Sequence, residues 1–130
     1  MSIQLPESVR RLVGWAHDKK AFDVVVLDLR ESSAFTDYFV ICSAQSTRQV
    51  RAIVDEVTRH LRASHARPSH VEGYDSAEWV LIDCFAVVIH VFTHDTRRFY
   101  DLERLWGAAR RIACEPPHPS DALPRLDAEQ

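Results

Sequence analysis

The sequence predicts an α/β domain in which helices flank a single mixed sheet. Three observations indicate this class. The chain has 130 residues, a common size for one globular domain. Hydrophobic residues make up 46% of the chain and charged residues 27%, so there is enough apolar material for a core. Segments with the period of a strand are interspersed with segments that have the period of a helix.

The first half of the chain begins with a predicted helix over residues 6–18. Pro6 suits the first turn of a helix, and apolar residues then recur at helical spacing. Residues 23–29 (DVVVLDL) are apolar and mostly β-branched, and residues 36–43 (TDYFVICS) are rich in strand-forming residues. We therefore expect two strands, connected by residues 31–35.

A second helix is predicted to begin at Ser46. Ser46 and Gln49 have the spacing of a capping box, in which the serine side chain caps helix amides and Gln49 reaches back to the cap. We expect the helix to end between Ala63 and Pro68. Apolar residues share one face of it and arginines lie mostly elsewhere, as in a surface helix packed on a sheet. The apolar residues are Val50, Ile53, Val54, Val57 and Leu61.

Two strands and a last helix are predicted in the second half of the chain. Residues 78–83 (EWVLID) and 85–92 (FAVVIHVF) have strand composition. They follow each other so closely that a tight hairpin near Cys84 should join them as antiparallel neighbours. A helix capped within residues 93–96 is expected to run to about Ile112. Its apolar stripe consists of Phe99, Leu102, Leu105, Trp106 and Ala109.

The chain is expected to comprise one domain over residues 1–113 and a flexible tail over residues 114–130. The sequence after Cys114, EPPHPSDALPRLDAEQ, has four prolines and few large apolar groups. Burial there could not offset the entropy of ordering it. Four acids and one arginine give residues 115–130 a charge of −3, which leaves residues 1–114 neutral.

Composition and motifs narrow the class of protein. No apolar run reaches the roughly 20 residues that span a bilayer. The N-terminal residues have no apolar stretch after their basic residues and include acids, so we expect a cytoplasmic protein. Cys42, Cys84 and Cys114 form no CxxC pair, which argues against a disulfide framework. A neutral body lacks the field of a nonspecific nucleic-acid binder, so we expect little or no direct nucleic-acid readout.

The predicted hairpin brings together the most informative side chains. Alternation puts Trp79, Leu81 and Asp83 on one face of their strand, and the same face of the partner strand carries His90. One interpretation is that Asp83 and His90 form a hydrogen-bonded pair beneath a helix, as buried polar groups usually do. The other is a partly open face that docks a protein partner, with Trp79 as an aromatic anchor.

Catalysis and cofactor binding have little support in the sequence. Seven histidines have no spacing that gathers three or four zinc ligands, so we expect neither a metal nor another cofactor. GxSxG and local cysteine–histidine motifs do not occur, and the three glycines provide no phosphate-binding loop. Ser43 and Ser46 precede a helix whose amides, with Arg48, could hold a phosphate, although a plain N-cap is the more common role of serine there.

Three segments of the chain share a specific pattern: TDYFVICSAQSTRQVRAIVDEV (36–57), EGYDSAEWVLIDC (72–84) and HVFTHDTRRFYDLERLW (90–106). Together they resemble the ribosomal silencing factor family, also called the RsfS or Iojap family. The match covers residues 21–109, nearly all of the predicted domain. Its most specific positions are Trp79, Asp83, His90, Phe92, Arg97, Tyr100, Leu102, Glu103, Leu105 and Trp106.

The resemblance implies a fold similar to a catalytically inactive nucleotidyltransferase core and a role in translation that is not enzymatic. Members of the family bind the large ribosomal subunit at its intersubunit face through a ribosomal protein, the fourteenth in the large-subunit naming series. There they sterically block joining of the small subunit and repress translation under nutrient limitation. The sequence agrees in one respect, because residues 23–29 and 36–43 contain no Asp-x-Asp or Asp-x-Glu pair to hold two metal ions.

Carried over by position, the resemblance assigns seven residues to partner binding. Arg97, Tyr100 and Glu103 also match the family pattern, and a docking role and a packing role are equally open for them. Residues 84–86 (CFA) replace the glycine-containing turn usual in the family, so we expect a hairpin of different shape. The seven partner-binding residues are Glu72, Tyr74, Trp79, Leu81 and Asp83, with Asp37 and Tyr38 nearby.

Two other classes of function also fit the sequence. One is a residual nucleotide-binding or nucleotidyltransferase-like enzyme that uses residues 43–48. The other is a homodimeric interaction module, because a partly apolar sheet face can pair with a second copy of itself. A ribosome-binding factor that acts by occlusion needs neither chemistry nor a cofactor.

Overall fold

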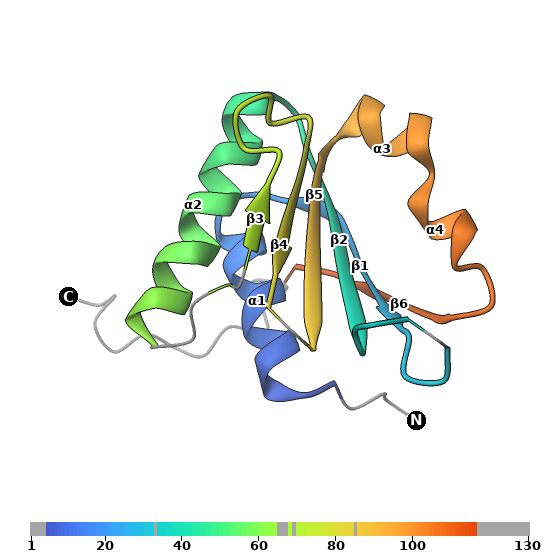
Figure 1. Ribbon diagram of the computed structural model, residues 1–130. Coiled ribbons are helices and arrows are strands. Elements are labelled where there is room, and N and C mark those ends of the chain that lie inside the picture. The colour runs from blue at the N-terminus through green and yellow to red at the C-terminus, as the bar shows by residue number, and fades with distance from the viewer. Residues whose placement is uncertain (1–4, 33, 65–67, 69, 85, 117–130) are drawn as a thin grey trace.

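A computed structural model describes residues 5–32, 34–64, 68, 70–84 and 86–116. Within these residues the centre is a six-stranded sheet with the order β3-β4-β5-β2-β1-β6 (Figure 1). The strands are β1 (Phe22–Asp28), β2 (Tyr38–Ala44), β3 (His70–Glu72), β4 (Trp79–Asp83), β5 (Val87–Thr93) and β6 (Arg110–Cys114). The helices are α1 (Glu7–Asp18), α2 (Thr47–Ala63), α3 (His94–Tyr100) and α4 (Leu102–Leu105).

The sheet is mixed, as the sequence predicts. Strands β2 and β5 run parallel, with Tyr38 opposite Val87 and Ala44 opposite Thr93. Helix α2 lies in the long connection that a parallel pair requires. The other neighbouring strands are antiparallel, including β4 and β5. The predicted antiparallel hairpin is therefore confirmed.

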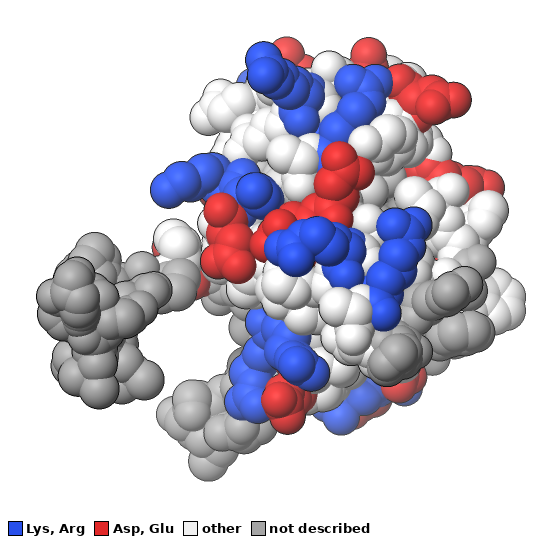
Figure 2. All heavy atoms as spheres, turned by 90° about the vertical axis from the view of Figure 1, so that its left-hand side faces the viewer, with Lys and Arg blue, Asp and Glu red and all other residues white. Residues whose placement is uncertain are grey.

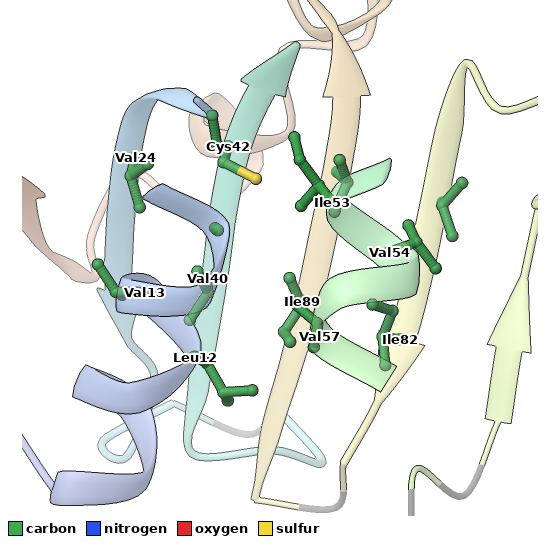
Figure 3. Packing of buried hydrophobic residues seen from close by; sticks show 14 of the residues in the cluster. Leu12, Val13, Val24, Val40, Cys42, Ile53, Val54, Val57, Ile82 and Ile89 are labelled. Carbon is green, nitrogen blue, oxygen red and sulfur yellow. The ribbon is translucent and has the colours of Figure 1, made fainter. Parts of the chain in front are cut away.

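Helices α1 and α2 cover one face of the sheet, and the main core lies between them and the strands (Figure 1). Side chains of both helices point toward the strands (Figure 3). Their spacing of three and four residues puts them on one side of each helix, as the sequence predicts. The labelled residues of this layer are Leu12, Val13, Ile53, Val54 and Val57 from the helices, with Val24, Val40, Cys42, Ile82 and Ile89 from the strands.

The start of α2 confirms half of the predicted capping box. The Ser46 hydroxyl accepts a hydrogen bond from the Gln49 amide at 3.1 Å, as an N-cap should. The Gln49 side chain accepts from the Gln45 amide at 2.7 Å rather than from Ser46. It also donates to the carbonyls of Lys19 and Lys20 at 3.0 and 2.9 Å. Gln49 thus joins α2 to the end of α1.

Helices α3 and α4 lie on the opposite side of the sheet from α1 and α2 (Figure 1). They close a second, smaller cluster over β1, β2 and β5, made of Val25, Leu27, Leu29, Ile41, Phe92 and Leu102. Strands β3 and β4 lie beyond this cluster at one edge of the sheet. Leu81 and Asp83 of β4 are only half-buried on that side. This face of the sheet is therefore partly open.

The long last helix predicted to reach Ile112 is wrong. Asp101 has φ 49° and ψ 53°, a left-handed conformation that ends α3. After α4 the chain becomes strand β6, whose residues Arg110–Cys114 pair with β1. The edge of the sheet offers backbone hydrogen bonds that outweigh the helical pattern of the sequence. The short strand β3 was also not predicted.

Other predicted boundaries agree closely with the structure. The predicted helix at residues 6–18 corresponds to α1, and the strands at 23–29 and 36–43 correspond to β1 and β2. In the hairpin, the Cys84 amide donates to the Val87 carbonyl at 2.8 Å, while Phe85 lies outside the described residues. Most of the predicted tail, residues 117–130, also lies outside them. Among the described helices, none combines the length and apolarity needed to cross a membrane.

Candidate docking surface

The open part of the sheet carries four of the predicted partner-binding residues. Alternation along β4 is confirmed, since Val80 and Ile82 are fully buried toward the helices. Residues Trp79, Leu81 and Asp83 point to the other side, where each is half-buried. Glu72 of β3 lies opposite Leu81, so the two share a face. We call this surface the docking face; it consists of Glu72, Trp79, Leu81 and Asp83.

Trp79 is the largest side chain of the docking face, and other rings hold it in place. Its ring stacks on Phe92 with a centroid distance of 4.9 Å and an interplanar angle of 26°. Tyr100 of α3 approaches it at 5.0 Å. The indole Nε1–H donates to Nδ1 of His90 at 3.0 Å. Trp79 is therefore a half-buried ring with a fixed orientation, as an anchor requires.

The hydrogen-bonded pair predicted between Asp83 and His90 is wrong. His90 does share the face of Asp83, but its Nδ1 accepts from Trp79, and its Nε2 has no partner among the described residues. The register explains this outcome, because both Trp79 and Asp83 are diagonal to His90 across the β4–β5 pair. The long indole spans such a diagonal more readily than a short carboxylate. Burial lowers the pKa of His90 to about 4, so the ring is neutral at physiological pH.

The structure does not bring all the predicted residues to the docking face. Tyr38 is 5% exposed and packs in the core under the helices. The Tyr74 hydroxyl donates to the Asp55 carboxylate at 2.9 and 3.1 Å, so this ring lies against α2. That hydrogen bond raises the pKa of Tyr74. Asp37 is exposed at the start of β2, where its amide donates to the Ala86 carbonyl at 2.9 Å. Tyr38 and Tyr74 therefore stabilise the fold from the opposite side.

Two consecutive exposed aromatic residues, Phe99 and Tyr100, extend the surface beside Trp79. Phe99 is 80% exposed and Tyr100 is 53% exposed, and their rings meet edge to face at 5.0 Å. We call this pair the aromatic rim. Phe99 was predicted to lie in a buried apolar stripe. Adjacent residues point in different directions on a helix, so the consecutive pair could have indicated that at least one ring is exposed.

Arg97 and Glu103 form a structural cluster rather than part of the docking face. Arg97 is 9% exposed and donates to Glu103 Oε1 at 3.0 Å, to Ser43 Oγ at 2.9 Å and to the Asp23 carbonyl at 2.6 Å. Arg111 of β6 also donates to Glu103, at 3.3 Å. Burial alone would raise the pKa of Glu103, but the two arginines outweigh it and hold that pKa below its usual value. The cluster ties α3 and α4 to the sheet.

The same cluster bears on the nucleotide-binding alternative. Ser43 is fully buried and its hydroxyl accepts from Arg97, while the Ser46 hydroxyl caps α2. A cavity of about 310 Å³ lies beside Arg97, and its lining mixes acidic residues such as Asp23, Asp101 and Glu103 with Arg98 and Arg111. Within it, the Glu103 carboxylate already accepts hydrogen bonds from both Arg97 and Arg111. In the described part of the chain, no group of three or more potential metal-ligating side chains occurs. The arrangement favours the N-cap interpretation of residues 43–48.

The helix-covered side of the molecule has a different character. Figure 2 shows Lys and Arg side chains interspersed there with Asp and Glu. On α2 the exposed charged residues include Arg48, Asp55, Arg59 and Arg62. This surface is polar and of mixed sign, so it offers no field of one sign, and its half-buried Trp15 stacks on His60 of α2. The docking face and the aromatic rim are the better candidate for protein recognition.

Gly73 controls the backbone under Trp79, and Gly73→Ala is expected to lower the free energy of unfolding by about 2 kcal/mol. Gly73 has φ +89°, and a Cβ there would lie 2.2 Å from the Trp79 carbonyl oxygen. Urea unfolding of the variant measures the loss. Gly14→Ala is the matched control, because Gly14 lies inside α1 with open space around it. That change should stabilise the protein by up to about 1 kcal/mol. Equal behaviour of both variants would contradict the assignment.

Comparison with known proteins identifies the family to which the chain is related. Residues 2–130 match the model of the family described as "Ribosomal silencing factor during starvation". The chain is 40% identical over 109 residues to a Halalkalibacterium halodurans protein named ribosomal silencing factor RsfS, covering 84% of this chain and 93% of that protein. It is 44% identical over 92 residues to the Bacillus subtilis protein of the same name, covering 71% and 78%.

The fold agrees with a solved structure as well. A crystal structure of a protein from Bacillus halodurans superposes with a TM-score of 0.74 at 38% sequence identity. The match covers 83% of this chain and 98% of that one. The sequence pattern, the mixed sheet and these relatives lead to one conclusion: the chain belongs to the ribosomal silencing factor family.

Proposed function

We propose that this chain represses translation in the cytoplasm by binding the large ribosomal subunit at its intersubunit face. The partner there is a ribosomal protein, the fourteenth of the large subunit, and the bound chain sterically blocks joining of the small subunit when nutrients are limiting. The single observation that carries this proposal is the partly open sheet face on which Trp79 is held in a fixed orientation, in a member of the ribosomal silencing factor family.

The docking face fits the physical requirements of such a mechanism. Occlusion needs a stable interface and no chemistry, and a standard interface covers about 800 Å² of each partner. A half-buried aromatic ring can supply much of the affinity when a partner desolvates it. Glu72 and Asp83 add carboxylates to the same face, which suits a basic ribosomal protein and speeds encounter.

Co-sedimentation with separated ribosomal subunits tests this function. The purified chain should pellet with free large subunits and be absent from small subunits and from joined ribosomes. Adding it before the two subunits are mixed should reduce the yield of joined ribosomes, whereas adding it afterwards should have less effect. Binding to neither subunit at micromolar protein and moderate salt would overturn the proposal. Equal binding to joined ribosomes would contradict occlusion.

Trp79→Ala is expected to weaken binding to the large subunit by about 2 kcal/mol, roughly 30-fold in Kd, because it removes the anchor. Equilibrium binding to labelled large subunits measures the change. Trp15→Ala is a matched control, since Trp15 is also half-buried but stacks on His60 at 4.6 Å on the helix side. Both variants should be tested for folding by circular dichroism. An unchanged affinity for a folded Trp79→Ala protein would remove Trp79 from the interface.

A further inference from the structure

The polar atom of Trp79 faces into the protein rather than toward a partner. We propose that His90 is a positioning residue of the docking face: it holds the Trp79 indole so that a partner meets the ring surface and no hydrogen-bond donor. This inference rests on the proposed function and deepens it. It assigns a role to a residue that would not itself touch the partner, because His90 is only 3% exposed.

The geometry around the indole supports this role. Trp79 lies opposite Phe92, and its Nε1 reaches diagonally to Nδ1 of His90 at 3.0 Å. Phe92 stacks on the indole at 4.9 Å, and Tyr100 lies 5.0 Å away. Stacking alone would also allow the indole to flip by about 180° about χ2, which keeps the ring plane but reverses the N–H edge. The hydrogen bond to His90 supplies the directional contact that fixes the edge of the indole.

His90 is an unusual choice if packing is its only role. Because Nδ1 accepts from Trp79, the proton of the neutral ring lies on Nε2. Nε2 is buried and has no hydrogen-bond partner among the described residues, which costs stability. Phe39 packs edge to face against the ring at 4.5 Å, so the site is otherwise aromatic. The Nδ1 acceptor explains why a histidine occupies this position. Burial lowers the pKa of His90, so Nδ1 stays unprotonated and can accept the hydrogen bond from Trp79.

The orientation of the indole has a consequence for the partner. Since Nε1–H is already donated, Trp79 can contribute ring area and stacking but no hydrogen bond. The aromatic rim extends this surface, as Tyr100 touches both Trp79 and Phe99 at 5.0 Å. A basic ribosomal protein can meet such a surface with apolar side chains or with an arginine stacked on a ring. Trp79→Phe should therefore retain more affinity than Trp79→Ala.

A double-mutant cycle on large-subunit binding tests the inference. His90→Phe keeps a ring of similar size but removes the acceptor, and His90→Asn keeps an acceptor near the position of Nδ1. Each is made in the wild-type chain and in Trp79→Phe, which has no indole N–H. We expect His90→Phe to weaken binding about 10-fold in the wild-type background and less than about 2-fold in Trp79→Phe, giving a clear coupling energy. His90→Asn should stay within about 3-fold of wild type.

The free protein provides a second readout. In nuclear magnetic resonance spectra of folded His90→Phe, the indole proton of Trp79 should shift and exchange faster with solvent, whereas His90→Asn should protect it. Equal losses of affinity in both Trp79 backgrounds would show a merely structural role and overturn the inference. So would unchanged affinity of a folded His90→Phe chain. If the wild-type chain fails to bind large subunits, the proposed function fails first, even where the indole proton behaves as expected.

Discussion

Replacing Arg97 with leucine is expected to lower the free energy of unfolding by about 3 kcal/mol. Arg97 is nearly buried and donates to Glu103, Ser43 and the Asp23 carbonyl, so it connects α3, α4, β1 and β2. Its removal leaves the Glu103 carboxylate in a low-dielectric site without its nearest cation. Breaking a buried ion pair from one side typically costs 3–5 kcal/mol, and the partial exposure of Glu103 favours the lower end of that range. Urea unfolding measures the loss.

A neighbouring arginine provides the control for this prediction. Arg111 contacts the same carboxylate at 3.3 Å, but its side chain is 56% exposed. Arg111→Leu should therefore cost less than about 1 kcal/mol. Similar losses for both variants would show that Arg97 acts as a surface charge. If Arg97→Leu does not fold, the conservative Arg97→Lys should still lose stability, since an ammonium cannot make all three contacts.

The residues that match the family pattern fall into two groups: some are buried and hold the fold together, and others lie at the surface. Arg97 and Glu103 lie inside the fold and hold α3 and α4 on the sheet. Trp79 and Tyr100 lie at the surface and form one aromatic patch. Arg97 and Glu103 thus orient the helices, and α3 carries Tyr100 of the aromatic patch. Loss of binding in an Arg97 variant would therefore follow from displacement of α3.

Much of the fold could be predicted because the sequence pattern of most strands and of the two long helices matches the structure that they adopt. The core face of α2 repeats at helical spacing, and β4 alternates between buried and half-buried residues. Strand β6 could not be predicted in this way. Residues Arg110–Cys114 continue an apolar pattern that also suits a helix. They form a strand only because they pair with β1 at the edge of the sheet. The left-handed Asp101 that redirects the chain has no specific sequence signature.

The site was predictable to the extent that it depends on one strand. Alternation alone separates Trp79, Leu81 and Asp83 from the buried residues of β4. Tyr74 and Tyr38 depend on contacts distant in the sequence: Tyr74 bonds to Asp55 of α2, and Tyr38 packs on the helix-covered face. Resemblance to a family identifies equivalent positions in the sequence, but it does not show in which direction each side chain points. The bond from Trp79 to His90 likewise becomes visible only in three dimensions.

Acidification is expected to destabilise the protein through His90 before most carboxylates are protonated. The pKa of His90 is about 4 in the folded protein, because burial disfavours the charged ring, against 6.5 when exposed. Between these values the unfolded chain binds more protons than the folded one, so stability rises with pH in this window and falls as pH drops from about 6.5 toward 4. A difference of this size corresponds to about 3 kcal/mol.

The contribution of His90 can be isolated by comparing pH profiles of the free energy of unfolding. His90→Asn does not titrate, so its profile should be flatter than that of the wild type by about 3 kcal/mol between pH 7 and pH 4. Asp28 and Glu103 also have lowered pKa values, and the stability that they contribute is lost at lower pH in both proteins. Parallel profiles for wild type and His90→Asn would mean that the ring accepts a proton without leaving its buried site. Because protonation of Nδ1 would also break the bond to Trp79, loss of stability and freeing of the indole should occur over the same pH range.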